Sequence, residues 1–393
     1  MQKRKLGIAV VGLGGAVGTT MVAGIELLKQ GLIGTEGLPL AESRAELAAY
    51  DEIVFAGWDL FSADLAEAAE GHEVLSHKQF VAAEPALRQV RPWRSVANNS
   101  FLSNIEGDNI FEASDHAKAV EQIRKDLRNF RERCEKVVMI NLASTEKLST
   151  EESEGLKTVE EFERAISDNS AKISPAMTYA YAAIKEGVPY GNFTPSVSVD
   201  LPALTELAEK ENVPVAGKDG KTGQTFVKTV LAPALRSRAL KVEGWYSTNI
   251  LGNRDGLALS NEDSLRSKVK TKHSVLRNIL GYEVEDHIVD IRYYKPRGDN
   301  KEAWDNIDVA GFLGQPMQIK VNFLCRDSVL AAPLAIEIAR CLDLASRRGK
   351  GGVQEQLSVF FKSPMTKNGD PEQAFHKQEA LLDAWLSETG KRP

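Results

Sequence analysis

The chain has 393 residues, of which 42% are hydrophobic and 26% charged, and its formal net charge is -6. Single hydrophobic cores stop growing near roughly 250–300 residues, so this length predicts two domains. The lack of a basic run argues against a nucleic-acid partner, and the lack of ~18 unbroken apolar residues argues against a membrane span. The three cysteines, Cys134, Cys325 and Cys341, are too scattered for a disulfide framework and are predicted to be packing residues in a reducing, cytoplasmic compartment.

A glycine-rich turn follows an apolar run at residues 6–11 and precedes a predicted helix over 16–29. A buried strand that turns through glycines into a helix lets the backbone approach a pyrophosphate, so the turn predicts a dinucleotide site. Val17 occupies the third glycine position of the usual pattern and Gly18 comes one residue later, which keeps a structural tight turn open as the alternative. The cofactor-binding candidates in this turn are Gly12, Gly14, Gly15, Ala16, Val17 and Gly18.

The second strand is predicted over 52–56, after a long loop at 31–49, and it leads to Asp59. An acidic residue at this place projects toward an adenosine ribose in dinucleotide-binding folds. Alternatively, Asp59 caps a helix that begins near Ser62. A third strand over 136–142 runs into Ser144 and Thr145, and strand ends in parallel sheets hold ligands.

The rest of the chain changes character near Lys241. Before it, strands alternate with helices; after it, the chain is strand-rich, and helices then return. Helices are predicted over 114–135, 159–167, 176–187, 201–211, 224–240, 328–344, 353–361 and 372–386, and further strands over 242–246, 287–294, 309–312 and 317–324. The predicted fold class is α/β, a Rossmann-type doubly wound parallel sheet (1–240 plus 326–393) with a second α+β domain (241–325) inserted before the C-terminal helices.

A polar segment at 247–256 is followed by a predicted helix that begins near Ser260. Lys268 and Lys272 lie four residues apart on that helix, so both side chains emerge on one face. For an arbitrary helix, a solvated lysine stripe is the more common explanation of this spacing. Two further lysines, Lys301 and Lys362, stand in polar turns.

Six segments together resemble the myo-inositol-1-phosphate synthase family in its shorter prokaryotic form: 12–18, 57–59, 217–225, 247–256, 298–301 and 325–333. The resemblance implies NAD-dependent isomerising cyclisation of D-glucose 6-phosphate to 1L-myo-inositol 1-phosphate, the first step of inositol biosynthesis. In this family NAD oxidises carbon 5, an enolate forms at carbon 6 and attacks the carbon 1 aldehyde, and the ring ketone is then reduced. NAD is therefore a bound catalyst, and the reaction has no net redox change.

The resemblance also implies roles for individual residues. It makes Lys268, Lys272, Lys301 and Lys362 active-site lysines and Asp219, Asn253 and Asp255 their polar partners. Lys268 is predicted to transfer the proton at the carbon 5 oxygen, Lys272 and Lys301 to stabilise oxyanions, and Lys362 to serve the aldol carbonyl or the phosphate. Crowding of cations is expected to lower the pKa of such a lysine. Asp327 and Ser328 are predicted near the nicotinamide, although Ser328 also suits a helix cap.

The resemblance further implies a homotetramer, in which the second domain serves catalysis and oligomerisation. It leaves open a divalent or monovalent cation near Ser247 or Asp327, since a Lewis acid polarises a carbonyl. Two other functions stay open. An NAD-dependent dehydrogenase of a phosphorylated sugar or polyol would accumulate NADH, and a nucleotide-sensing or scaffold protein would show no turnover.

Overall fold

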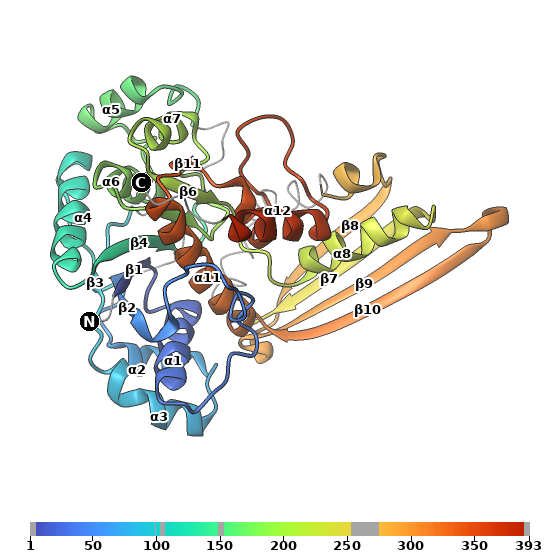
Figure 1. Cartoon of the computed structure of the whole chain (residues 1–393), viewed down its shortest axis with the longest axis horizontal. Coiled ribbons are helices and arrows are strands. Elements are labelled where there is room, and N and C mark those ends of the chain that lie inside the picture. The colour runs from blue at the N-terminus through green and yellow to red at the C-terminus, as the bar shows by residue number, and fades with distance from the viewer. Residues whose placement is uncertain (1–4, 99, 103–106, 148–152, 253–274, 389–393) are drawn as a thin grey trace.

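The computed structural model describes residues 5–98, 100–102, 107–147, 153–252 and 275–388, and these form two sheets (Figure 1). The larger sheet has seven parallel strands in the order β11-β6-β5-β4-β1-β2-β3. They are β1 (Leu6–Val11), β2 (Ile53–Asp59), β3 (Trp93–Arg94), β4 (Lys136–Asn141), β5 (Tyr190–Asn192), β6 (Pro214–Gly217) and β11 (Gly352–Val353). The strand order reverses between β1 and β4, where doubly wound sheets open the crevice that takes ligands.

Helices cover both faces of this sheet. One face carries α1 (Ala16–Lys29), α2 (Leu65–His72), α3 (His77–Leu87) and α11 (Asp327–Arg347); the other carries α4 (His116–Arg131), α5 (Val159–Ser167), α6 (Pro175–Lys185) and α7 (Pro202–Lys210). Successive side chains of a strand point to opposite faces, so Ile8 and Val10 pack in one core, and Ala9 and Val11 in the other. Helix α12 (Phe375–Ser387) joins the first core near the C-terminus.

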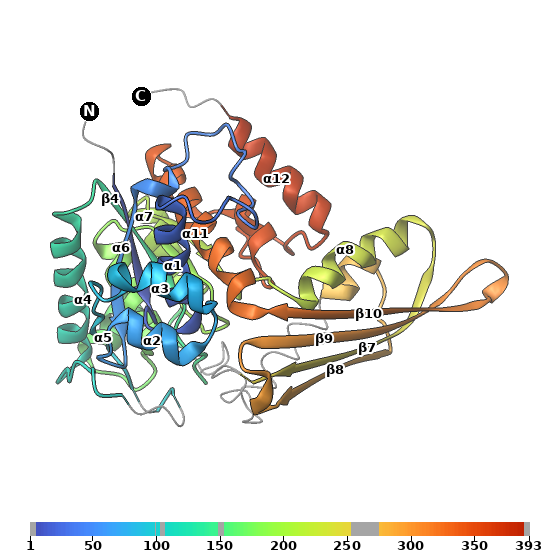
Figure 2. The ribbon, with the colours of Figure 1, turned by 90° about the horizontal axis from the view of Figure 1, so that it is seen from below.

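The smaller sheet has the strand order β10-β9-β7-β8 and a core of its own. Its strands are β7 (Lys241–Leu251), β8 (Asp286–Tyr293), β9 (Asn300–Ala310) and β10 (Pro316–Arg326). Helix α8 (Gln224–Ser237) lies along one face of this sheet (Figure 2), and Leu235 packs there with Trp245 and Ile307. Strand β10 continues directly into α11, so the chain returns to the large sheet at Asp327.

The predicted fold class is confirmed: a doubly wound parallel sheet is combined with a second sheet that precedes the last helices. The first strand and helix match the predicted bounds, because the apolar run and the glycines that end it act locally. Three short 3-10 helices were not predicted: η1 (Tyr50–Glu52), η2 (Lys295–Arg297) and η3 (Phe312–Gly314). All three cysteines are buried and free, as predicted.

Several predicted elements differ from the structure in kind or extent, and the strand predicted over 309–312 is the end of the longer strand β9. The helix predicted over 353–361 is instead the end of β11 followed by a 3-10 helix, η4 (Glu355–Phe360), because Val353 pairs in parallel with Val215. Lys301, predicted in a turn, lies near the start of the long strand β9, where it pairs with Cys325 of β10. Within the described ranges, no helix combines the length and hydropathy needed to cross a bilayer.

Candidate active site

The glycine turn joins β1 to α1 as predicted. Gly12 has φ +87°, a left-handed conformation that glycine adopts without strain, and its amide donates to the carbonyl of Trp58. Gly15 is the N-cap of α1, and no side chain caps this end. The first amides of α1 therefore face the crevice with the positive end of the helix dipole, which suits a pyrophosphate. Of the turn, Val17 lines the pocket described below, and Gly12, Gly14, Gly15, Ala16 and Gly18 are not among its lining residues.

Gly18 has a structural role that explains its displaced position. A Cβ built on Gly18 would lie 2.3 Å from the carbonyl oxygen of Leu13, which is far inside contact distance. The third glycine of a dinucleotide turn allows this kind of close packing between helix and strand. In this chain the closest approach falls one residue later than in the usual pattern, and Val17 is free to face the pocket.

Asp59 lies at the end of β2, and its carboxylate is directed at the glycine turn. Its oxygens accept hydrogen bonds from the amides of Gly14 at 2.8 Å and Phe61 at 3.1 Å. It does not cap the next helix, since α2 begins at Leu65 and Asp64 is its N-cap. The helix predicted to begin near Ser62 thus starts three residues later, and the capping alternative for Asp59 is wrong.

The end of β4 forms a second wall of the pocket. Leu142, Ala143 and Thr145 line it, whereas Ser144 lies in the same segment without lining it. Asn141 holds this turn, because its side-chain oxygen accepts a hydrogen bond from the amide of Ala143 at 3.1 Å. The parallel sheet therefore brings the predicted Thr145 to the crevice, as its place after a strand indicated.

Glu146 anchors the segment that carries Thr145. Its carboxylate is buried and accepts a hydrogen bond from the amide of Ala176, in the first turn of α6, at 2.8 Å. Burial raises the pKa of Glu146 to about 7, although Ser174 and the Ala176 amide oppose the shift. The folded protein therefore binds a proton at Glu146 more tightly than the unfolded chain does.

We expect Glu146→Gln to remove a pH-dependent loss of stability. In the wild type, the stabilising proton on Glu146 is fully present below pH ~4.5 and is lost as pH rises through ~7. Glutamine keeps the acceptor for Ala176 without the ionisation. Between pH 5 and pH 8, the wild type should lose roughly 1–3 kcal/mol of unfolding free energy that the variant keeps, as measured by denaturant unfolding. If the difference in unfolding free energy between variant and wild type is the same at both pH values, this interpretation is wrong.

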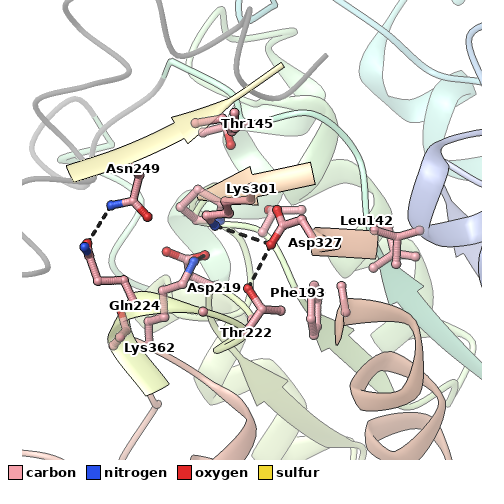
Figure 3. A pocket seen from close by; sticks show the side chains of 18 of the residues that line it. Leu142, Thr145, Phe193, Asp219, Thr222, Gln224, Asn249, Lys301, Asp327 and Lys362 are labelled. Carbon is pink, nitrogen blue, oxygen red and sulfur yellow. Dashed lines mark hydrogen bonds and ion pairs between the residues drawn. The ribbon is translucent and has the colours of Figure 1, made fainter. Parts of the chain in front are cut away.

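Two lysines and two aspartates meet at the centre of the pocket (Figure 3). The Lys301 Nζ atom lies 3.3 Å from Oδ1 of Asp327, and the Lys362 Nζ atom lies 2.8 Å from Oδ1 of Asp219. The hydroxyl of Thr222 also donates to Asp327, at 3.2 Å. These residues come from β9, from the start of α11, and from the loops that follow β6 and η4. Four of the predicted residues, Lys301, Lys362, Asp219 and Asp327, therefore converge from distant parts of the chain.

Backbone hydrogen bonds fix the two loops that carry Asp219 and Lys362. The amide of Lys362 donates to the carbonyl of Asp219 at 2.7 Å, and the amide of Lys221 donates to the carbonyl of Phe360 at 2.8 Å. Asp219 itself has φ +60°, an uncommon backbone conformation for a residue with a side chain. Such strain is found where the surrounding structure demands a particular side-chain direction.

Lys301 has a raised pKa rather than the lowered pKa expected from crowding by cations. Burial lowers the pKa of this ammonium, but the charge of Asp327 and its contact with Lys301 more than offset burial, and Asp219 adds to the effect. Lys301 therefore keeps its proton at neutral pH. A fixed positive charge suits the stabilisation of an oxyanion.

Ser328 lies next to the pocket residue Asp327 but is itself buried. Its hydroxyl donates to Asp299 at 2.6 Å, and its amide also contacts the Asp299 carboxylate. The Asp299 carboxylate thus accepts hydrogen bonds from the first turn of α11. Ser328 is a donor to this carboxylate and does not itself cap the helix. Ser247, considered as a cation ligand, is also buried, and its hydroxyl donates to Asp305 at 2.6 Å.

Four predicted site residues, Asn253, Asp255, Lys268 and Lys272, lie outside the described residues. Among those that are described, the pocket also contains residues that were not singled out: Phe193, Thr222, Gln224 and Asn249. Asn249 donates to the Gln224 side chain at 2.6 Å (Figure 3). Thr222, Gln224 and Asn249 fall within the segments that carry the family resemblance, which was the signal available for finding them.

The fold and the site define a class of protein, a dinucleotide-binding α/β enzyme whose substrate pocket is completed by a second sheet. A sequence model of the family described as myo-inositol-1-phosphate synthase, an NAD-binding family, matches residues 33–387. The chain belongs to this family.

Similar proteins support the same assignment. The chain is 43% identical over 385 residues to inositol-3-phosphate synthase 1 of Bacteroides thetaiotaomicron, which covers 92% of this chain and 90% of that protein. The crystal structure of inositol-3-phosphate synthase from Caenorhabditis elegans superposes with a TM-score of 0.91 at 27% identity, covering 100% of this chain and 87% of that one. A myo-inositol-1-phosphate synthase-related protein from Thermotoga maritima shares the fold, with a TM-score of 0.83 at 23% identity and coverage of 99% and 100%.

Proposed function

We propose that this enzyme converts D-glucose 6-phosphate to 1L-myo-inositol 1-phosphate, with NAD held in the β1–α1 crevice. The observation that carries the proposal is the meeting of Lys301 and Lys362 with the wall formed by Val17 and Thr145 in one pocket. A simple dehydrogenase needs a cofactor crevice and a proton acceptor. An enolisation followed by an aldol step also needs fixed cations beside the reacting oxygens.

NAD bound in this crevice would supply reversible hydride transfer, so that the oxidation at carbon 5 and the reduction of the ring ketone cancel. The chain supplies the rest. Lys301, charged and held by Asp327, stabilises the oxygen that becomes negative when carbon 6 loses its proton. Lys268 is proposed to transfer the proton at the carbon 5 oxygen, and Lys272 to stabilise the oxyanion of the aldol step. Asn253 and Asp255 are proposed to orient these two lysines.

The first turn of α8 is proposed to hold the substrate phosphate together with Lys362. Thr222, Gly223, Gln224 and Thr225 line the pocket at this helix terminus, and Gly223 is an N-cap without a side chain. Helix N-termini bind phosphates through free amides and the helix dipole. Lys362, held by Asp219 at the same pocket, adds a positive charge. A phosphate at this end would direct the sugar chain toward Lys301.

The test is an incubation with glucose 6-phosphate and NAD, followed by assay of phosphate released by periodate. Inositol phosphate without net NADH supports the cyclisation. Net accumulation of NADH would instead identify a dehydrogenase of a phosphorylated sugar or polyol. No turnover of either kind would leave a nucleotide-sensing or scaffold role.

Asp59 is proposed to bind the adenosine ribose and to select NAD over NADP. A carboxylate accepts hydrogen bonds from ribose hydroxyls and repels a 2′-phosphate. Asp59→Asn keeps an acceptor for Gly14 but removes the charge. We expect NAD affinity to fall by about tenfold to a hundredfold, the value of a hydrogen bond to a charged group, and NADP to become a usable cofactor. Unchanged kinetics with both cofactors would remove Asp59 from the ribose site.

A divalent or monovalent cation is proposed only as an accessory. Within the described ranges, no group of three or more His, Cys, Asp or Glu side chains is arranged to hold a metal ion. Asp327 is a carboxylate that lines the pocket, so a cation there would also need oxygens from the substrate or cofactor. Dialysis against a chelator tests the divalent case: kcat should fall and recover on adding Mg²⁺ or Zn²⁺, and an unchanged rate would exclude a divalent accessory cation.

The chain is proposed to divide into a cofactor domain (1–240 plus 326–393) and a catalytic and oligomerisation domain (241–325), and to form a homotetramer. The face of the small sheet opposite α8 exposes apolar side chains, including Tyr246, Ile288 and Leu324. Exposed apolar patches mark interfaces. Light scattering coupled to size-exclusion chromatography would measure the mass. The proposed compartment is the cytoplasm.

A further inference from the structure

Two charged side chains lie buried behind the pocket, between α8 and the small sheet. Lys228 of α8 is 1% exposed and Asp305 of β9 is 0% exposed. Trp245, which contacts both of them, belongs to the apolar core of the small sheet together with Leu235 and Ile307. Burying two charges costs free energy that apolar side chains of similar size would not, so their presence calls for a specific role.

The indole of Trp245 on β7 connects the two charges. Its Nε1 donates a hydrogen bond to Oδ1 of Asp305 at 2.7 Å, and the Lys228 Nζ atom lies 5.6 Å from the ring centroid. The carboxylate accepts the indole N–H, which makes the π face of the ring more negative, and the ammonium over that face makes the N–H a stronger donor. Each of the two contacts therefore strengthens the other. Lys228, Trp245 and Asp305 thus form an indole-bridged ion pair.

The indole-bridged ion pair ties together every strand and helix that meets there. Nε2 of His287, on β8, lies 2.6 Å from the Lys228 Nζ atom. The hydroxyl of Ser247, on β7, donates to Asp305 at 2.6 Å. Helix α8 and strands β7, β8 and β9 are therefore joined at one point.

Two elements, β7 and α8, connect the indole-bridged ion pair to the pocket. Ser247 and Asn249 share a face of β7, because side chains alternate along a strand, and Gln224 lies one turn before Lys228 on α8. Asn249 and Gln224 line the pocket and are hydrogen-bonded to each other. The placement of α8 against β7 therefore sets the geometry of this pair and of the helix terminus proposed to take the phosphate.

We propose that Lys228, Trp245 and Asp305 are positioning residues, whose bridged charges hold Gln224, Asn249 and the first turn of α8 in the geometry that turnover requires. The inference deepens the proposed function and rests on it. The proposal differs from a packing role because it attributes the effect on turnover to the charges of Lys228 and Asp305 and not to the volume of their side chains. A shift of about 1 Å at a substrate-positioning group is enough to reduce turnover strongly.

The charge state of Lys228 supplies a readout that a packing role would not. The ionisable groups that face Lys228 within the described ranges are His287 from β8 and Asp305 from β9. Burial lowers the pKa of Lys228 to about 7, and the charge of Asp305 opposes the shift. Raising the pH therefore discharges Lys228, and Asp305 then loses its counter-charge.

The test uses the full-length enzyme with Lys228→Met, Asp305→Asn and the double variant. We expect each single substitution to lower kcat by about tenfold or more, with NAD affinity unchanged, since the cofactor crevice lies elsewhere. In the double variant, kcat should still be reduced by about fivefold, which is less than the product of the two single effects. The reason is that the same interaction is lost in both single variants and in the double variant. The wild-type kcat profile should decline above pH ~7 through an ionisation that Lys228→Met lacks.

Ile307→Val is the matched control. Ile307 lies on the same face of β9 as Asp305, two residues away, and belongs to the same core. It should lose about 0.5–1.5 kcal/mol of stability with kcat within twofold of the wild type. Circular dichroism gives the folded fraction by which every rate is corrected.

Folded single variants with wild-type kcat and pH profile would overturn the proposal. If the single variants do not fold, the double variant decides, since it leaves no unpaired buried charge; wild-type turnover in it would also overturn the proposal. Should the wild type itself make no inositol phosphate, the proposed function has failed instead. The affinity for inorganic phosphate then serves as the readout, and it should weaken in Lys228→Met but not in Ile307→Val.

Discussion

A Lys301→Met variant is expected to lose about a hundredfold to a thousandfold in kcat for inositol phosphate formation, the usual effect of removing one oxyanion-stabilising group. The side chain of Lys301 is partly buried at the pocket, and Asp327 keeps it charged. Methionine fills nearly the same space but cannot donate to a developing negative oxygen. Enolisation and the aldol step should therefore be slowed, whereas substrate binding through the phosphate end should change little.

The measurement separates these effects by comparing kcat, KM for glucose 6-phosphate and NAD affinity. Lys125→Met is the control, because Lys125 is exposed on α4, in the helical layer away from the pocket. The control should behave as the wild type. Equal kcat values for Lys301→Met and Lys125→Met would show that Lys301 has no part in turnover.

A Gly18→Ala variant is expected to bind NAD at least about tenfold more weakly and to lose roughly 1–3 kcal/mol of stability, as overpacked sites do. The new Cβ would lie 2.3 Å from the Leu13 carbonyl oxygen, which is backbone and cannot rotate away. Helix α1 must then shift from the turn, and the shift moves the amides proposed to hold the pyrophosphate.

Gly24→Ala provides a control in the same helix. A Cβ at Gly24 would meet no heavy atom within 4 Å. Alanine in a helix interior is favoured over glycine by about 0.5–1 kcal/mol, so this variant should be slightly more stable and bind NAD normally. Calorimetric titration with NAD and thermal unfolding test both variants. If Gly18→Ala matched Gly24→Ala in both measurements, the close approach of Gly18 to Leu13 would be required neither for NAD binding nor for stability.

Local signals in the sequence were sufficient where neighbouring residues determine the structure. The strand before the glycine turn and helix α1 have the predicted bounds, because an apolar run, the glycines and the helix-forming residues act over short distances. Strand β7 was predicted at less than its full length, since its later residues Ser247 and Asn249 are polar. They are polar because they face the buried charge of Asp305 and the pocket, which composition alone does not reveal.

The site was predictable as a set of residues but not as a geometry. The family resemblance singled out Lys301, Lys362, Asp219 and Asp327, and the structure places all four in one pocket. Their pairing could not be predicted, because it depends on contacts such as that between the Lys362 amide and the Asp219 carbonyl, 143 residues apart in the chain. The raised pKa of Lys301 follows from this pairing, and reasoning from crowded cations alone gave the wrong direction.

The small sheet has a hydrophobic core of its own, separate from the two cores that sandwich the large sheet. Heating can therefore melt the two bodies in separate calorimetric steps. Because the pocket takes walls from both, catalysis ends with the first step, whichever body it is. If the small sheet melts first, a melting temperature read from the helical signal overstates the temperature range in which the enzyme works, because most helices of the described residues pack on the large sheet.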